Sequence, residues 1–228
     1  MARAKVSVVF PTLNSAEELS ACLGCLGEGL SAGLIRELII TDGGSTDGTI
    51  ALAEEAGAVV ISGQKSRGGQ LRRGCSIAQG EWLLVLHADT QLEPGWTESV
   101  IDHLSRPTLK VGYFKLAYRA NGIAPRIVAT WANLRSRLFG LPYGDQGLLI
   151  AAKTLGSVGG FDDIPLMEDV ALIHKLRGQL RRLDGVASTS AEKYIRQGWL
   201  KRGTLNILML LRYFAGVDPK TLAREYAK

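Results

Sequence analysis

Over the first ninety residues, short apolar runs alternate with segments that have a helical pattern. Four runs have the length and composition of strands: Lys5–Phe10, Arg36–Thr41, Ala58–Ser62 and Trp82–Leu86. The last is apolar without a break, which is typical of a strand buried on both faces of a parallel sheet. The intervening segments carry apolar residues at helical spacing, from Ser15 onward, over Ile50–Ala56 and over Arg67–Gln79. Because strand and helix alternate, the pattern predicts an α/β fold with a mostly parallel, Rossmann-like sheet and helices on both faces.

The second half of the chain is less regular. Its periodicity predicts helices over Gly95–Leu104, Ile123–Leu138 and Glu168–Leu176, and strands over Val111–Arg119, Gln146–Ala151 and Leu183–Thr189, the last at a sheet edge. Residues 194–213 read as one helix with a basic start and an apolar end. With no internal repeat or low-complexity linker, we expect one α/β domain, residues 1–192, followed by an amphipathic helical tail, residues 193–228.

Composition narrows the class of protein. The chain has 228 residues, of which 46% are hydrophobic and 21% charged, as in an ordinary globular protein. No apolar run approaches the roughly 20 residues that span a bilayer, and no signal peptide is recognised at the N-terminus. Three cysteines, an odd number, favour a reducing compartment, so we expect a cytoplasmic protein.

Charge is divided unevenly along the chain. Residues 1–114 contain 9 Lys/Arg and 13 Asp/Glu, a net −4, whereas residues 115–228 contain 18 and 9, a net +9. A basic second half favours anionic partners but also fits a solvated surface. The basic residues before Leu205–Phe214 fit a helix lying on an anionic membrane, which would make the protein peripheral on its inner face. Packing on its own domain, or in a homodimer, remains the alternative, and no nucleic-acid motif is present.

Acidic residues follow two of the expected strands. His87, Ala88 and Asp89 end the strand Trp82–Leu86, at the position where open α/β sheets bind ligands. Asp89 is therefore a candidate metal ligand, although it can also cap the next turn. The loop Asp42–Thr49 places acids and hydroxyls among glycines, so that its backbone can approach a ligand and Asp42 can accept hydrogen bonds from a nucleobase or ribose. A capped turn with Asp47 as N-cap is the alternative.

Taken together, these motifs resemble family 2 glycosyltransferases of the GT-A fold. The resemblance covers about residues 5–177 and rests on the ordered set Pro11-Thr12-Leu13-Asn14, the Asp42–Thr49 loop, the helix with Arg67, Gln70 and Gly74, Asp89, and the pair Glu168-Asp169 after Gly159-Gly160-Phe161-Asp162. The sequence is similar in particular to a small bacterial subgroup of this family that has a His-Ala-Asp-Thr element. An ordered set of this kind is more specific than any single motif.

The resemblance implies a role for each matching residue. The donor, a nucleotide-diphosphate sugar, would be bound by Pro11, Thr12, Asn14, Asp42, Gly43, Gly44, Ser45, Asp47, Arg67, Gln70, His87, Ala88, Asp89 and Gln146. Asp89 would bind Mg²⁺ or Mn²⁺, which neutralises the diphosphate leaving group. Asp169 would be the general base on an acceptor hydroxyl, with Glu168 positioning it, and a single displacement would invert the anomeric centre. For Gln146, a hairpin turn is an equal alternative, and helix-start acids are the alternative for Glu168 and Asp169.

The sequence also departs from the family pattern. Many relatives have Asp where His87 stands and Tyr where Leu13 stands, and the Gln/Arg-x-x-Arg-Trp element of polymerising relatives has no match, which argues against processive synthesis. Two other functions remain open. A sugar nucleotidyltransferase would need a Gly-rich loop that Pro11–Asn14 lacks, and a catalytically silent module would dock on membranes or partners through the basic tail.

Overall fold

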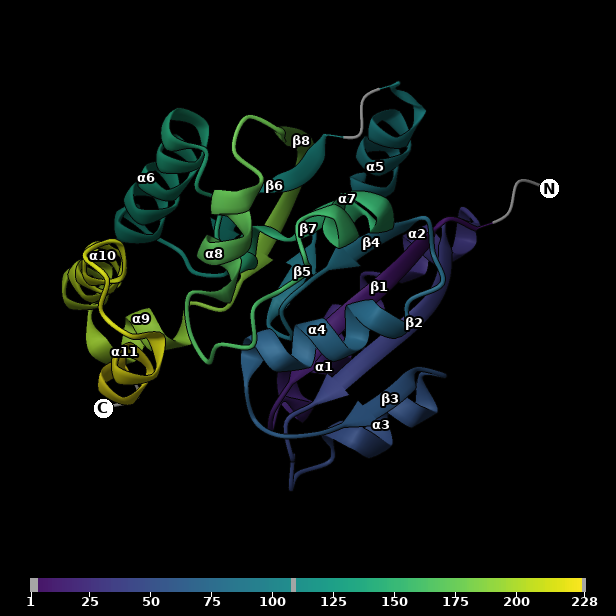
Figure 1. The fold of residues 1–228 in the computed structure, drawn as a ribbon, viewed down its shortest axis with the longest axis horizontal. Helices are drawn as coiled ribbons and strands as arrows, with labels where there is room; N and C mark the ends of the chain where they lie inside the picture. Colours follow the sequence, from purple (N-terminus) through teal and green to yellow (C-terminus); the bar gives the residue numbers. More distant parts are fainter. Residues whose placement is uncertain (1–3, 108–109, 227–228) are drawn as a thin grey trace.

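An eight-stranded sheet runs through the centre of the computed structural model, which describes residues 4–107 and 110–226 (Figure 1). The strand order is β3-β2-β1-β4-β7-β6-β8-β5. In chain order the strands are β1 (Val6–Thr12), β2 (Ile35–Asp42), β3 (Val59–Ser62), β4 (Trp82–Val85), β5 (Thr90–Leu92), β6 (Val111–Tyr118), β7 (Leu148–Ala151) and β8 (Leu180–Thr189).

The direction of the strands brings six strand ends to one edge of the sheet. β1 to β4 are mutually parallel, β7 is antiparallel to both β4 and β6, and β8 is parallel to β6. The carboxyl ends of β1, β2, β3, β4, β6 and β8 therefore lie along the same edge. This is the edge at which open α/β sheets bind ligands.

Helices cover both faces of the sheet, as the sequence predicts. They are α1 (Ala16–Gly24), α2 (Gly27–Ser31), α3 (Thr49–Glu55), α4 (Arg67–Ile77), α5 (Trp96–Ser105), α6 (Ile123–Phe139), α7 (Ala152–Ser157), α8 (Glu168–Lys175), α9 (Glu192–Gln197), α10 (Trp199–Phe214) and α11 (Pro219–Tyr226). Adjacent strand residues point to opposite faces, so Val8 joins a core with α1, α3 and α5, whereas Val9 joins a second core with α4, α8, α10 and α11.

The tail differs from the single helix expected over residues 194–213. Gly198, with φ of 88°, separates α9 from α10, and α11 adds a further helix near the C-terminus. A positive φ interrupts a helix and is readily adopted only by glycine. One side of α10 packs on the domain, because Met209 and Leu210 share a core with Leu172 of α8.

Several short elements were not predicted. The structure adds α2, β5, α7 and a 3-10 turn over Gly144–Gln146, called η1. β8 is longer than expected and is not an edge strand, because Ala187–Thr189 pair with β5 on the side opposite β6. In the described part of the chain, no helix combines the length and apolarity required to cross a membrane.

Candidate active site

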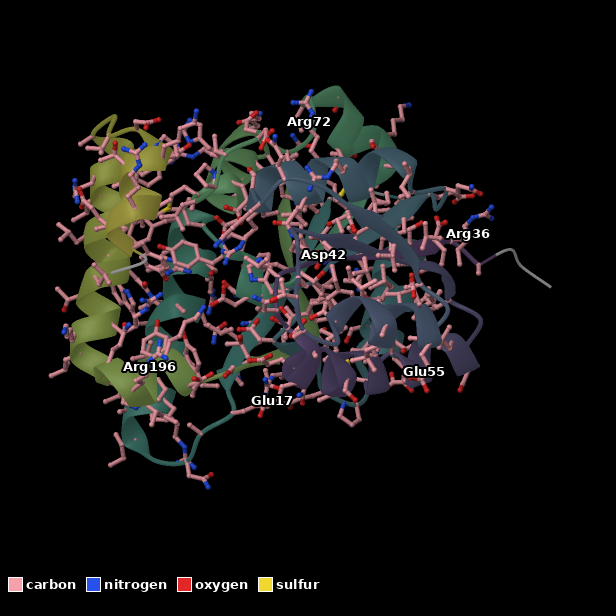
Figure 2. All side chains as sticks on the ribbon, turned by 90° about the horizontal axis from the view of Figure 1, so that it is seen from below. Glu17, Arg36, Asp42, Glu55, Arg72 and Arg196 are labelled. Atoms are coloured by element: carbon pink, nitrogen blue, oxygen red, sulfur yellow. The ribbon has the colours of Figure 1, made fainter. Side chains whose placement is uncertain are left out.

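The loops that follow β1 and β2 are joined around the carboxylate of Asp42. Oδ1 of Asp42 accepts hydrogen bonds from the hydroxyls of Thr12 and Ser45, and Oδ2 accepts from the backbone N–H groups of Gly44 and Ser45, each at 2.7 Å. Figure 2 shows Asp42 in the interior, and the residue has no exposed surface. Burial opposes its ionisation, but these hydrogen bonds lower the pKa of Asp42 below its usual value. The two loops therefore hold this carboxylate in a fixed position, and its contact with a nucleobase or ribose stays a prediction.

Asn14 connects the same two loops from the solvent side. Its backbone N–H donates to Ser45 Oγ at 2.7 Å, and its Oδ1 accepts from Thr46 N–H at 2.8 Å. Asp47 adds a further link by accepting a hydrogen bond from Ala16 N–H at 3.1 Å. Asn14 has a φ of 47°, which residues other than glycine rarely adopt. The loops thus form a pre-organised bed, with Asn14, Gly44 and Asp47 exposed on its surface.

Gln70 of α4 holds this bed from the interior of the protein. Its Nε2 donates to the carbonyl oxygens of Thr12 and Thr41, both at 2.8 Å, and the side chain is only 4% exposed. Gly43 lies so close that a Cβ atom there would be 3.0 Å from the Gln70 Oε1. Gln70 therefore fixes α4 against the strand ends, and the donor contact implied by the resemblance stays a prediction.

Gln146 is fully buried in η1. Its Nε2 donates to Phe114 O at 3.0 Å, while its Oε1 accepts from Ser136 Oγ at 2.6 Å and from Tyr143 N–H at 3.3 Å. Gln146 therefore lies in a 3-10 turn and not in a hairpin turn, its amide is hydrogen-bonded within the protein, and its sugar contact stays a prediction. Ala88 is also buried, and its carbonyl accepts a hydrogen bond from the Cys22 thiol at 2.8 Å.

Ionisable side chains from η1, α4, α8 and the loop after β4 converge beside the bed. Asp89 is half-buried, and its carboxylate receives no hydrogen bond from the described residues, while its backbone carbonyl accepts from Arg119 Nη2 at 2.9 Å. His87 Nδ1 lies 3.9 Å from the Asp145 carboxylate. Arg67 Nε lies 3.7 Å from Oε1 of Glu168. Residues distant in the sequence thus form one charged cluster.

His87 is held as a neutral side chain within this cluster. Burial and the nearby guanidinium of Arg67 lower its pKa, and they outweigh the carboxylates of Asp145, Asp89 and Asp169, which act in the opposite direction. The imidazole also lies against Gly144, where a Cβ atom would be only 2.3 Å from Nε2. A glycine is therefore required at residue 144 for His87 to keep its place.

The acidic pair at the start of α8 divides into two environments. Met167, the residue before the helix, has a φ of 68°, so the backbone makes a left-handed turn immediately before Glu168 and Asp169. Glu168 is 1% exposed, with no hydrogen-bond partner on either carboxylate oxygen. Burial raises the pKa of Glu168 to about 7, and the positive charge of Arg67 only partly offsets this. Asp169 is half-exposed, and its Oδ2 accepts a hydrogen bond from Gly144 N–H at 2.7 Å.

Sequence reasoning missed Asp145 as a member of the cluster. In the segment Gly144–Gly147, the resemblance implies a role only for Gln146. The available signal was a carboxylate between glycine-bounded positions just before a buried strand. Arg119 was also missed, because its role, bonding the carbonyls of Asp89 and Ser188, depends on β6 lying beside β8.

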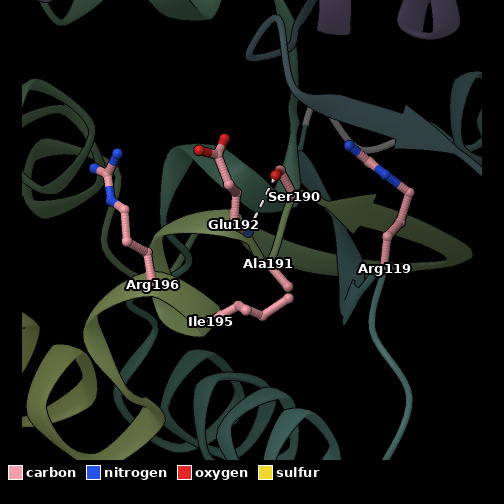
Figure 3. Close-up of a pocket in the computed structure, with 6 residues that line it drawn as sticks. All are labelled: Arg119, Ser190, Ala191, Glu192, Ile195 and Arg196. Atoms are coloured by element: carbon pink, nitrogen blue, oxygen red, sulfur yellow. Dashed lines mark hydrogen bonds between the residues drawn. The ribbon is translucent and has the colours of Figure 1, made fainter.

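A pocket of about 350 Å³ opens at the carboxyl ends of β6 and β8. It is lined by Arg119, Ser190, Ala191, Glu192, Ile195 and Arg196, and Figure 3 shows Glu192 between the two arginines. Arg119 links it to Asp89 through the hydrogen bond described above. The pocket therefore adjoins the charged cluster.

A divalent cation fits the chemistry of Asp89. The described residues contain no group of three or more His, Cys, Asp or Glu side chains that could hold a metal by themselves. A single carboxylate without a hydrogen-bond partner suits Mg²⁺ or Mn²⁺, because these ions retain water and bind phosphate oxygens. The site thus fits a cation shared with a bound diphosphate better than a fully protein-bound ion.

Comparison with known proteins agrees with this geometry. The model of glycosyl transferase family 2 matches residues 7–143. A "PGL/p-HBAD biosynthesis glycosyltransferase" of Mycobacterium bovis is 36% identical over 99 residues, which are 40% of this chain and 38% of that relative's length. A relative of the same description from Mycobacterium tuberculosis has the same identity and coverage.

Solved structures share the fold at low sequence identity. Residues 1–349 of S. aureus TarS have a TM-score of 0.64 at 16% identity, with 90% of this chain and 64% of that one covered. Glucosyl-3-phosphoglycerate synthase from Mycobacterium tuberculosis, with Mn²⁺, UDP and glucosyl-3-phosphoglycerate bound, has a TM-score of 0.56 at 20% identity, with 82% and 70% covered. These likenesses confirm the predicted GT-A-like fold. Since the family model spans more than half of its residues, the chain belongs to glycosyl transferase family 2.

Proposed function

We propose that the protein moves a sugar from a nucleotide-diphosphate sugar to an acceptor hydroxyl, with inversion at the anomeric carbon. The observation that carries this proposal is the convergence of Asp89, Arg67 and Asp169 beside the bed formed by the loops after β1 and β2. Asp89 and Asp169 have partly exposed side chains and no basic side chain at salt-bridge distance among the described residues, whereas Asp145 lies beside His87 and Glu168 is buried beside Arg67.

The donor's nucleotide would lie on the bed. The exposed surfaces of Asn14, Gly44 and Asp47, together with Pro11, would contact it, while Thr12, Asp42 and Gln70 keep the bed in shape. Arg67 is 43% exposed and remains cationic, because Glu168, Asp169 and Asp145 raise its pKa against the effect of burial. It would bind the diphosphate. A divalent cation at Asp89 would supply charge neutralisation to the leaving diphosphate.

Asp169 is suited to act as the general base. The Gly144 N–H donates to its carboxylate at 2.7 Å and so fixes its position, and the side chain remains partly exposed. In the transfer, the acceptor oxygen bonds to the anomeric carbon while the bond to the diphosphate breaks, and the acceptor proton passes to Asp169. The electron pair of the broken bond leaves with the nucleoside diphosphate. Glu168 would position Arg67 from the interior.

The acceptor would enter through the pocket at Arg119 and Glu192, since that pocket adjoins the charged cluster. UDP was bound in the mycobacterial synthase and UDP-GlcNAc in TarS, so uridine nucleotides are the first donors to test. Because the matched segments cover 38% of the Mycobacterium bovis relative and 64% of the TarS chain, neither donor nor acceptor is taken over from them. The division into a catalytic domain, residues 1–192, and a tail, residues 193–228, stays part of this proposal.

A panel of nucleotide sugars in thermal shift, with and without Mn²⁺, would identify the donor and test the cation together. In calorimetry, Asp89→Asn should lose metal-dependent binding of the nucleoside diphosphate. Asp169→Asn should retain this binding and lower the transfer rate by roughly 10²–10⁴-fold. Asp184→Asn, at an exposed carboxylate on β8, is the control that should change neither.

The outcomes also separate the alternatives. Unchanged affinity in Asp89→Asn would remove the metal role, and full activity in Asp169→Asn would remove the base. Release of pyrophosphate from a nucleoside triphosphate and a sugar phosphate would point instead to a sugar nucleotidyltransferase. Absence of turnover with every nucleotide sugar, together with intact lipid or partner binding in both variants, would point to a silent docking module.

A further inference from the structure

Helix α6 exposes an apolar stripe along its length. The side chains of Ile123, Ile127, Trp131, Leu134 and Leu138 recur at intervals of three and four residues and are 76, 63, 48, 44 and 63% exposed. This spacing places them on one helical face. A helix on a globular domain normally turns such a face toward the core, so the stripe is unusual.

Helix α10 exposes a second stripe of the same kind. Leu200, Ile207, Leu208, Leu211 and Phe214 are between 43 and 89% exposed, whereas Met209 and Leu210 on the other side are buried in the core. The sequence predicts that the apolar end of this helix meets either its own domain or a membrane. The structure divides that end into one face that packs on the domain and another that is left outside.

The two stripes belong to one region of the surface. Helices α6 and α10 are in contact, and Figure 1 shows them with α9 on one side of the molecule, away from β3 and α3. Among the described residues, sixteen large hydrophobic side chains are exposed, and twelve of these lie on α6, α9 and α10. Monomeric proteins rarely expose so large an apolar area unless it binds something.

The charges on and around this apolar surface are predominantly positive. Residues 103–144 and 193–217, which contain α6 and α10 entirely, include no Asp or Glu. Five exposed basic residues border the stripes: Arg126, Arg137, Lys193, Arg196 and Lys201. Within these helices the nearest exposed acid is Glu192, at the first position of α9.

We propose that α6, α9 and α10 form a face that docks on an anionic lipid bilayer. The leucine, isoleucine, tryptophan and phenylalanine side chains would enter the boundary between headgroups and acyl chains, while the basic residues bind lipid phosphates. A second copy of this chain suits the face less well. A two-fold interface pairs each patch with itself, and this patch would bring cations against cations with no acid on α6 or α10 to compensate them.

The docking face also reaches the acceptor pocket. Ile195 and Arg196 of α9 line that pocket, and α9 leads directly into α10. Docking would therefore hold the pocket next to the lipid surface. If the proposed transfer is correct, an acceptor embedded in the membrane could reach the pocket without leaving the bilayer.

Sedimentation with lipid vesicles tests the docking face independently of the transfer reaction. The wild-type protein should bind vesicles of phosphatidylcholine with phosphatidylglycerol, bind much less to phosphatidylcholine alone, and dissociate as salt is raised. Leu138→Glu on α6 and Leu211→Glu on α10, at side chains 63 and 61% exposed, should each weaken binding by roughly tenfold or more.

Leu30→Glu on α2 is the matched control, because Leu30 is also 61% exposed but lies on another part of the molecule. It should bind vesicles as the wild type does, and all three variants should keep the wild-type melting temperature and nucleotide response. Equal vesicle binding in all variants would overturn the proposal. So would a dimer in solution that fails to bind vesicles and dissociates in Leu211→Glu, since it would assign the face to a second copy.

Discussion

The buried carboxylate of Glu168 makes a quantitative prediction about stability against pH. Its side chain is 1% exposed, neither oxygen has a hydrogen-bond partner, and Arg67 approaches no closer than 3.7 Å. Burial raises the pKa of Glu168 from its ordinary value of 4.5 to about 7, although the charge of Arg67 acts against this. The folded protein therefore holds a proton here that the unfolded chain releases more readily.

The sign and size of the effect follow from proton linkage. A raised carboxyl pKa stabilises the fold fully below pH 4.5, and this contribution is lost as the pH rises toward 7. One pKa unit corresponds to about 1.4 kcal/mol, so this group should lower the free energy of unfolding by roughly 2–3 kcal/mol between pH 5 and pH 8. The substitution Glu168→Gln removes the titration while keeping the shape of the side chain.

Urea unfolding at pH 5 and at pH 8 measures this term. The wild-type protein should lose roughly 2–3 kcal/mol more than Glu168→Gln between the two pH values. Asp184→Asn, which changes an exposed carboxylate, should follow the wild type. Parallel profiles for the wild type and Glu168→Gln would show that Glu168 ionises normally in the folded protein and would refute the reasoning from burial.

Three further predictions concern Arg67 and two residues of the η1 turn. Arg67→Met should move the loss of stability to higher pH, because the variant lacks the cation that favours ionised Glu168. Urea unfolding at several pH values measures this, and a shift to lower pH would contradict it. Gly144→Ala should lower the transfer rate by about 10²-fold with donor affinity retained, since its Cβ would be 2.3 Å from the His87 Nε2 and would displace the N–H that fixes Asp169; unchanged steady-state rates would exclude this. Gln146→Ala should lower the free energy of unfolding by about 3 kcal/mol through three lost buried hydrogen bonds while leaving calorimetric donor affinity unaltered, and a selective loss of affinity would return Gln146 to the binding site.

Local pattern was sufficient for the framework of the fold. The strands β1 to β4 and the helices between them each show their type in their own pattern of apolar residues. They can therefore be predicted one after another along the chain. In the second half of the chain, some elements could not be predicted in this way, because their place in the sheet depends on which strands pair. β5 has three residues, and β8 becomes an inner strand only because β5 pairs with it on the side opposite β6. The helix break at Gly198 likewise depends on a single backbone conformation.

The sequence by itself determined that the Pro11–Asn14 segment, the Asp42–Thr49 loop and Asp89 lie at one edge of the sheet, because segments that follow parallel strands must meet there. It could not determine which of them face a ligand. Asp42, Gln70 and Gln146 have the same chemical groups as exposed binding residues, but in the folded chain buried hydrogen bonds use those groups internally. Only tertiary packing brings Asp145 next to His87 and Asp169 next to Gly144. A side chain's role here depends on whether its polar atoms are already satisfied, and only the three-dimensional structure decides that.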